Sequence, residues 1–159
     1  MEIVSTPKSP TGLMRALFRM PIHLYRWKLG PLLRKRFVLL QHRGRNSGME
    51  RHVVLEVINI DPHTDTVTVA SGYGTRSQWY RNLCAEPNAS IQLGNRRWAV
   101  RASFPTAEEG GVIMATYASR HRRVAIRLCR FMGFAVDGSP ADFQQVGEHI
   151  RFVRLTPRD

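Results

Sequence analysis

The stretch Ala70–Gly94, which reads ASGYGTRSQWYRNLCAEPNASIQLG, decides the predicted fold. It follows a β-branched run at 66–69 and passes through a glycine-bearing turn at 71–74, a pattern that predicts a strand and its exit. Ser77 suits the N-cap of the amphipathic segment at 78–85, which a proline terminates two residues later. Glycines let the backbone approach a ligand closely, and the first N–H groups of a helix favour an anion or an electron-rich carbonyl. The stretch therefore predicts a strand, a turn and a helix that together hold a ligand.

A second segment upstream, GRNSGMER at 44–51, has the composition of a phosphate-binding loop. It contains two glycines, two arginines and a serine hydroxyl within eight positions. Backbone N–H groups and guanidinium forks both bind phosphate oxygens. The simpler interpretation is that Arg45 and Arg51 only keep a hairpin loop in water, as most surface arginines do.

Together the two segments carry a resemblance to a known family. GRNSGMER followed by VVLEV, with ASGYGTRSQWYRNLCAEPNASIQLGNRRW, resembles the deazaflavin-dependent nitroreductase family, and the match covers roughly Phe37–Phe104 and, more loosely, the closing HIRFVRLTPR. Its most specific part is SxWYxNL at 77–83, and one departure is Asn46, where the family often has Lys or Arg. The resemblance implies an α+β fold: a split β-barrel of the flavin-reductase and pyridoxamine-oxidase kind, with antiparallel strands flanked by helices. It also implies coenzyme F-420, an 8-hydroxy-5-deazaflavin, with FMN as the alternative.

The resemblance and the residue types together predict a coenzyme site drawn from both segments. Its predicted members are Arg45, Asn46, Ser47, Gly48, Arg51, Ser71, Gly72, Tyr73, Gly74, Ser77, Trp79 and Asn82. Tyr73, between two glycines, is expected to form a wall of the ring site, whereas Trp79 also suits the core. Asn82 could cap a turn or bond the deazaflavin carbonyls. No catalytic residue is identified, and Tyr73 and Tyr117 are the candidates.

Composition limits the classes of protein that fit. With 159 residues, 43% of them hydrophobic, the chain suits one core that needs no disulfides, and Cys84 and Cys129 are expected to be buried, reduced thiols. The net charge of +12 implies an anionic partner. No apolar run is long enough to span a bilayer, no signal-peptide pattern is seen, and no metal-ligand spacing or nucleophile motif occurs. A cytoplasmic protein without a metal is therefore expected.

The chain divides into an N-terminal region, 1–30, and a barrel domain, 31–159. After a loose tail at 1–10, residues 11–30 mix apolar and basic side chains and predict two short helices. They could cover one end of the barrel or lie on anionic lipid at the inner face of the membrane. The rest of the chain predicts strands at 36–42, 51–60, 66–71, 90–93, 96–104 and 148–156, helices at 106–118 and 121–132, and a loop between Gly133 and Gly147.

The resemblance implies an oxidoreductase that passes a hydride from reduced F-420 to a quinone, nitroaromatic or similar small-molecule electron acceptor. The protein would supply binding and electrostatics while the coenzyme carries the hard chemistry. Two other classes stay open: a non-catalytic carrier of flavin, haem or lipid in the same barrel, and a basic barrel that binds nucleic acid. A nucleic-acid partner is not expected, because no RNA-binding signature is present. The sequence leaves a monomer and a homodimer equally open.

Overall fold

The computed structural model describes Glu2, Ile3 and residues 37–158. The predicted helices at 11–30 lie outside the described residues, so both interpretations of that segment stay predictions. Two residues of the expected loose tail do form structure: β1 (Glu2–Ile3) pairs antiparallel with β7 (Phe134–Ala135). The loose-tail prediction is therefore wrong for Glu2 and Ile3, because the register pairs them with Ala135 and Phe134.

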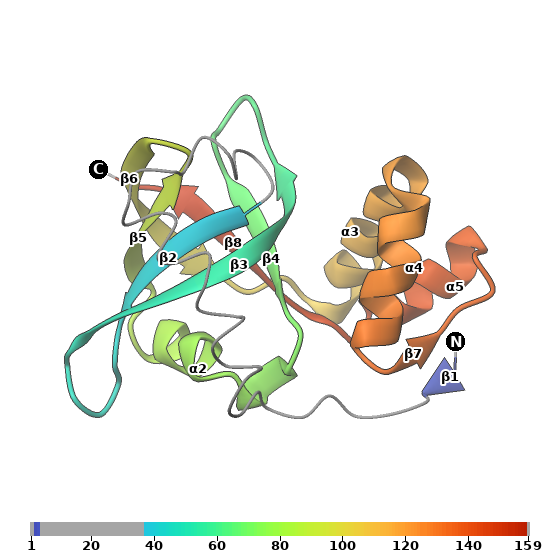
Figure 1. Ribbon diagram of the computed structural model, residues 1–159, viewed down its shortest axis with the longest axis horizontal. Helices are drawn as coiled ribbons and strands as arrows, with labels where there is room; N and C mark the ends of the chain where they lie inside the picture. The colour runs from blue at the N-terminus through green and yellow to red at the C-terminus, as the bar shows by residue number, and fades with distance from the viewer. Residues whose placement is uncertain (1, 4–36, 159) are drawn as a thin grey trace.

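Six antiparallel strands form a closed barrel, which confirms the predicted barrel fold (Figure 1). The strand order is β2-β3-β4-β8-β6-β5, so the last strand of the chain lies between β4 and β6. The strands are β2 (Phe37–Arg43), β3 (Glu50–Ile60), β4 (Val67–Ser71), β5 (Asn88–Leu93), β6 (Arg96–Ser103) and β8 (Arg151–Pro157).

Side-chain alternation explains why these segments close around a core. In β2, Val38 and Leu40 are fully buried on the inner face, and Ile91 of β5 and Val100 of β6 meet them from neighbouring strands. The predicted two-residue hairpin joins β5 to β6, where Gly94 adopts a φ of 61° that suits a glycine. The period of two, with turns of this kind, gives the meander connections of an antiparallel barrel.

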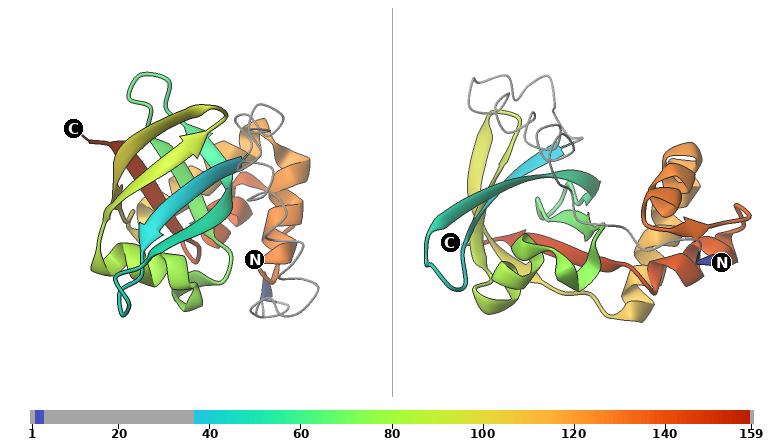
Figure 2. Two further views of the ribbon diagram at one scale, coloured as in Figure 1. Left: turned by 60° about the vertical axis from the view of Figure 1, so that its left-hand side comes forward. Right: turned by 60° about the horizontal axis from the view of Figure 1, so that its bottom comes forward.

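Helix α2 (Gln78–Ala85) covers one end of the barrel, as Figure 1 and both views of Figure 2 show. Its bounds are those predicted. Trp79, Tyr80 and Leu83 bury their side chains in the barrel core. The antiparallel registers bring the β2–β3 hairpin and the end of β4 to this same end of the barrel. The two sequence segments that predicted a ligand site therefore lie at one end of the molecule.

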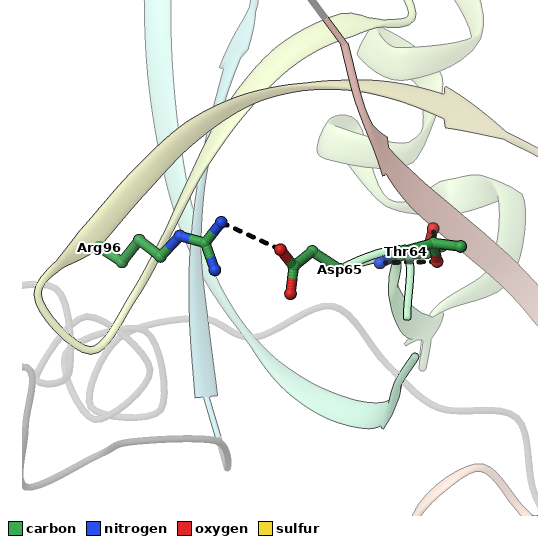
Figure 3. Close-up of polar contacts among 4 residues, drawn as sticks. Thr64, Asp65 and Arg96 are labelled. Atoms are coloured by element: carbon green, nitrogen blue, oxygen red, sulfur yellow. Dashed lines mark hydrogen bonds and ion pairs between the residues drawn. The ribbon is translucent and has the colours of Figure 1, made fainter. Parts of the chain in front are cut away.

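Short polar contacts join the turns at the opposite end of the barrel (Figure 3). Arg96, beside the β5–β6 hairpin, forms a 3.0 Å ion pair with Asp65 of the β3–β4 turn. The hydroxyls of Thr64 and Thr66 lie 2.8 Å apart in the same turn. The side chains of the ion pair are 64% and 42% exposed, so it contributes little to stability.

Three helices form a layer beside the barrel: α3 (Ala107–Arg120), α4 (Arg122–Phe131) and α5 (Pro140–Gly147) (Figure 1). The predicted capping box is confirmed, because the Thr106 hydroxyl accepts from the Glu109 N–H and the Glu109 carboxylate accepts from the Thr106 N–H. Met114, Phe143 and Phe152 belong to a second core cluster within this layer. Phe152 lies on β8, so that strand contributes to both clusters.

The predicted loop between Gly133 and Gly147 is wrong, because it contains β7 and all of α5. The start of α5 carries standard signals: the Ser139 hydroxyl accepts from the Asp142 N–H at 3.2 Å, and Pro140 occupies the first turn. The sequence interpretation gave Ser139 and Pro140 too little weight, because the segment is bounded by Gly133 and Gly147. The helix is stable because it packs on α3, a contact that its short sequence does not reveal.

Glycines set the close crossing of α3 and α5. A Cβ added at Gly147 would lie 2.6 Å from the Met114 Cβ and 2.8 Å from the Gly111 Cα, and would also overlap the Gly110 carbonyl. We expect Gly147→Ala to lower the free energy of unfolding by about 2–3 kcal/mol, since backbone must move to make room. Urea unfolding measures this effect. Gly72→Ala is the control, because its new Cβ meets only the end of the Phe131 ring, at 3.1 Å. Equal losses in both variants would contradict the role of the crossing.

Candidate functional site

The basic loop, residues 44–49, is a tight hairpin connection between β2 and β3. The Gly44 N–H donates to the Met49 carbonyl and the Gly48 N–H donates to the Gly44 carbonyl, both at 2.8 Å. The Met49 N–H donates to the Ser47 hydroxyl at 3.1 Å. Gly48 has a φ of 70°, and a Cβ at Gly44 would lie 2.6 Å from the Ser47 Oγ. Gly48 is therefore favoured by the backbone of the loop, and a larger residue than Gly44 would displace the Ser47 hydroxyl.

Arg45 ties this loop to α2. Its backbone N–H and its Nη1 both donate to the Asn82 Oδ1, at 3.1 and 2.8 Å, and its Nη2 donates to the Gln78 Oε1 at 2.9 Å. Gln78 and Asn82 are four positions apart, so they lie on the same face of the helix. One guanidinium thus fixes the loop against the helix, and we call this set of contacts the Arg45 latch.

The latch continues inward to a histidine. The Asn82 Nδ2 lies 3.2 Å from the Nδ1 of His42, and both side chains are buried. Burial, with smaller effects from His52 and Arg51, lowers the pKa of His42 from 6.5 to about 4. His42 is therefore neutral at pH 7, and its Nδ1 accepts a hydrogen bond from the Asn82 amide. The proton of the neutral imidazole then resides on Nε2.

The turn between β4 and α2 is closed by two buried serines. The Ser71 hydroxyl lies 2.7 Å from the Gly74 carbonyl and 2.9 Å from the Ser77 hydroxyl. Ser77 occupies the predicted N-cap position, but its side chain makes no capping bond to the helix. The three residues after Tyr73 form a short 3-10 turn, η2 (Gly74–Arg76). Gly74, with a φ of 60°, has open space around its Cβ position.

Tyr73 connects this turn with the helical layer. Its ring meets the ring of Phe131 at the end of α4 in an edge-on arrangement, with centroids 6.2 Å apart. Partial burial raises the pKa of Tyr73, so the phenol keeps its proton at neutral pH. Tyr73 thus lies where the α2 end of the barrel meets α4, and its hydroxyl can act as a hydrogen-bond donor.

The structure brings most predicted site residues to the α2 end, but in different environments. Asn46, Ser47, Gly48 and Arg51 are exposed, whereas Ser71, Ser77 and Asn82 are buried. Trp79 is 8% exposed and packs in the barrel core, which was the alternative interpretation for it. Tyr117 lies apart from the others, in the core of the helical layer beside His121.

Two residues of the latch were missed by the sequence analysis, His42 and Gln78. The alternation in β2 carries a signal for His42, because it continues the inward face of Val38 and Leu40. Gln78 precedes Asn82 by four positions, which is the spacing of helical neighbours. The expectation for the thiols was half right: Cys129 is buried, but Cys84 on α2 is exposed.

Positive charge surrounds the loop. Arg51 is the cross-strand partner of His42, so the two side chains project from the same face of the sheet. The exposed Arg51 side chain therefore lies beside the latch. Across the described part of the chain, the two ion pairs seen are Arg96 with Asp65 and Arg154 with Glu109, both away from the loop. Within that same part, the N–H groups of Asn46 and Ser47 donate to no protein acceptor. The loop therefore offers backbone donors and a guanidinium to an anion.

The described residues contain neither a metal-binding cluster nor a membrane-spanning helix. Residues 2–3 and 37–158 contain no group of three or more His, Cys, Asp or Glu that could hold a metal ion. No helix in those ranges is long and apolar enough to cross a membrane.

Comparisons with known proteins agree with the two motifs. The model of a family described as F420H(2)-dependent quinone reductase matches residues 17–123. A Mycobacterium tuberculosis protein named as putative F420H(2)-dependent quinone reductase Rv3178 is 38% identical over 74 residues, which are 45% of this chain and 60% of that relative. The chain thus spans less than two thirds of the length of this curated relative.

Solved structures support the fold alone. The Agrobacterium tumefaciens protein Atu2129, of unknown function, has a TM-score of 0.54 at 18% identity, covering 97% of this chain and 60% of its own. A pyridoxinephosphate oxidase family protein from Clostridium acetobutylicum has a TM-score of 0.50 at 6% identity, and the match covers 85% of this chain and 84% of the Clostridium chain. Because the family model matches well over half of the sequence, this chain belongs to the family of F-420-dependent quinone reductases.

Proposed function

We propose that this protein binds reduced coenzyme F-420 at the α2 end of the barrel and reduces a quinone or similar electrophile there. The observation that carries the proposal is the basic loop, because it presents donors outward while the Arg45 latch fixes its position. The family match through this region supports the same assignment. A nitroaromatic acceptor fits the same chemistry, since it also accepts a hydride.

The residues present fit this coenzyme. F-420 carries a phosphodiester and an acidic tail of glutamates, so it needs a ring slot and a basic surface. The N–H groups of Asn46 and Ser47, with the guanidinium of Arg51, form a donor set suited to phosphate oxygens. A Cβ at Gly74 would meet no atom within 4 Å, so the ring could approach the backbone at this turn, beside Tyr73. Asn46 supplies no charge where the family often has one, so Arg51 carries more of the phosphate binding.

The chain's own groups then have defined tasks. When bound, the reduced coenzyme supplies a hydride, which is two electrons and a proton nucleus, and one further proton completes the reduction of a quinone to a hydroquinone. The loop holds the phosphate end, and the turn at 71–74 sets the ring against the acceptor. Tyr73 keeps its proton at neutral pH, so its hydroxyl can polarise or protonate the acceptor oxygen. The Phe131 ring packs edge-on against Tyr73 and so borders the same turn.

A fluorescence titration tests the proposal. The purified full chain is expected to bind F-420 at least tenfold more tightly than FMN, since the basic loop can use the extra charges of the longer coenzyme. Reduced F-420 should then be oxidised in the presence of a soluble quinone. FMN binding tenfold tighter than F-420 would reverse the coenzyme assignment. F-420 binding without turnover of any quinone or nitroaromatic would favour the carrier class instead.

Arg51→Ala is expected to weaken F-420 binding by about 1.5–3 kcal/mol, because one charge-assisted contact to the phosphodiester is lost. Its melting temperature should stay near that of the wild type, since the side chain is exposed. Arg45→Ala should lower both the F-420 affinity and the melting temperature, because the Arg45 guanidinium makes two hydrogen bonds to α2 that alanine cannot make. Arg96→Ala, at the other end of the barrel, is the control for charge alone. If Arg51→Ala and Arg96→Ala bind F-420 equally well, Arg51 only solvates the loop.

A further inference from the structure

Helix α4 presents a stripe of arginines to solvent. Ala125 and Cys129 bury one face of the helix in the core of the helical layer. Arg123, Arg127 and Arg130 follow one another at spacings of four and three positions, so they form a row along the exposed side. We call these three residues the α4 arginine stripe. The family match ends at residue 123, so most of the stripe lies beyond it.

The charges of the stripe have no partners among the residues that the structure describes. Within residues 2–3 and 37–158, none of the three guanidinium groups makes an ion pair or a hydrogen bond. Exposed arginines of the barrel differ, since Arg97 donates to Gln92 at 2.9 Å and Arg101 donates to Asn88 at 3.3 Å. The sequence places no Asp or Glu anywhere from 111 to 136. The whole of α4 is thus left positively charged.

This charge is unfavourable for the helix itself. Arg122 and Arg123 stand in the first turn, where the helix dipole favours acidic residues, and that turn contains none. His121 at the N-cap makes no side-chain capping bond. Residues that disfavour the helix in which they lie indicate a function other than stabilising the fold, such as binding a partner.

Apolar side chains accompany the stripe. Val124 is 37% exposed and Phe131 is 48% exposed, and each directly follows an arginine of the stripe in sequence. Phe131 also contacts Tyr73, so the end of α4 reaches the wall of the proposed ring site. A row of basic residues with exposed apolar neighbours is the pattern of a helix that lies at a lipid interface.

We propose that α4 docks the protein on an anionic bilayer, with the arginine stripe on the headgroups and Val124 and Phe131 at the acyl boundary. The charge complementarity carries this choice of partner. The apolar neighbours favour lipid over a nucleic-acid duplex, which would pair with the arginines but not with Val124. Docking of this kind would place the Tyr73 end of the site near a lipophilic acceptor, and this consequence rests on the proposed function. The docking of α4 on the bilayer is independent of the proposed function.

Vesicle flotation with the full chain tests the docking. The wild type is expected to float with vesicles of phosphatidylcholine and phosphatidylglycerol at low salt, and to remain behind with phosphatidylcholine alone. Arg123→Gln with Arg127→Gln should lower the partition coefficient about 25-fold, at about fivefold for each charge removed. Val124→Gln should lower it severalfold at every salt concentration, because the apolar contact is not screened. The control, Arg97→Gln with Arg101→Gln, removes the same net charge from the barrel and should change binding less than threefold.

Three results would overturn the proposal. If the α4 double variant floats like the wild type, another segment of the chain holds the membrane. If the α4 and barrel variants lose binding equally, the attraction depends on net charge and not on α4. If the wild type ignores anionic vesicles but binds duplex DNA through the stripe, the partner is nucleic acid. Titration of each variant with F-420 keeps this question separate, because failure of coenzyme binding would refute the proposed function and leave the vesicle result unchanged.

Discussion

Replacing Asn82 with Ala is expected to lower the free energy of unfolding by about 3–5 kcal/mol and to release the basic loop from α2. The substitution removes the acceptor for two donors of Arg45 and the donor that faces the buried Nδ1 of His42. The buried Nδ1 of His42, left without a partner, costs about 1–3 kcal/mol, and each of the two partly buried bonds from the exposed Arg45 adds about 1 kcal/mol. Chemical denaturation measures the loss, and amide hydrogen exchange at residues 44–49 reports the freed loop.

A matched control is Asn88→Ala, which removes an exposed amide that accepts one bond from Arg101. It should cost less than about 0.5 kcal/mol, as surface substitutions usually do. Asn82→Asp gives an independent readout, because its carboxylate still accepts from Arg45 but faces His42 with negative charge. The pKa of His42 should then rise, which proton NMR detects. A His42 pKa that is unchanged in Asn82→Asp would mean that the two side chains do not interact in solution.

The second large effect is on the pH dependence of stability, through His42. Its pKa is about 4 in the folded protein and 6.5 in the unfolded chain. Above pH 6.5 the imidazole is neutral in both states, so its full contribution to stability is present. As the pH falls from 6.5 towards 4, the unfolded state binds a proton that the folded state does not, and stability decreases. Over this window the shift of about 2.5 units costs roughly 3 kcal/mol, and below pH 4 the effect levels off.

Urea unfolding between pH 7.5 and 4 measures this slope. His42→Gln should remove it, since no group then titrates at that position. His63→Gln should keep it, because His63 lies in the exposed β3–β4 turn. Carboxylates with lowered pKa values, such as Glu109 and Asp137, also make the protein less stable in acid. Their effect begins only as the pH falls below their pKa values in the unfolded chain, near 4. If the wild type and His42→Gln have the same slope from pH 6.5 to 5, the histidine is not buried as the structure has it.

Local patterns predicted the barrel well. The strand and helix limits around α2, the Gly94 hairpin and the capping box at Thr106 follow from residues within a few positions of one another. The α5 helix was missed although Ser139 and Pro140 mark its start, because its stability depends on distant packing against α3.

The sequence predicted which residues gather at the candidate site, but not which of them contact one another. The sequence placed Arg45 and Asn82 in one site, yet both were assigned to the coenzyme. Their mutual bonds join positions 37 residues apart, and no periodicity reveals a pairing of that kind. The alternation in β2 carried a signal for the burial of His42, but its contact with Asn82, 40 positions away, could not be read from the sequence. Residues whose chemistry suits a ligand can instead bind one another.

The position of β8 has a consequence for synthesis of the chain. Because β8 pairs with both β4 and β6, those two strands keep open edges until the ribosome has released residue 157. Val67 of β4 pairs with Leu155, which lies 88 positions later in the sequence, so closure is a late and long-range event. The nascent barrel therefore exposes two unpaired edges at the stage when chaperones act. A slow step near the end of folding, rather than an early one, would set how much of this protein reaches its native state.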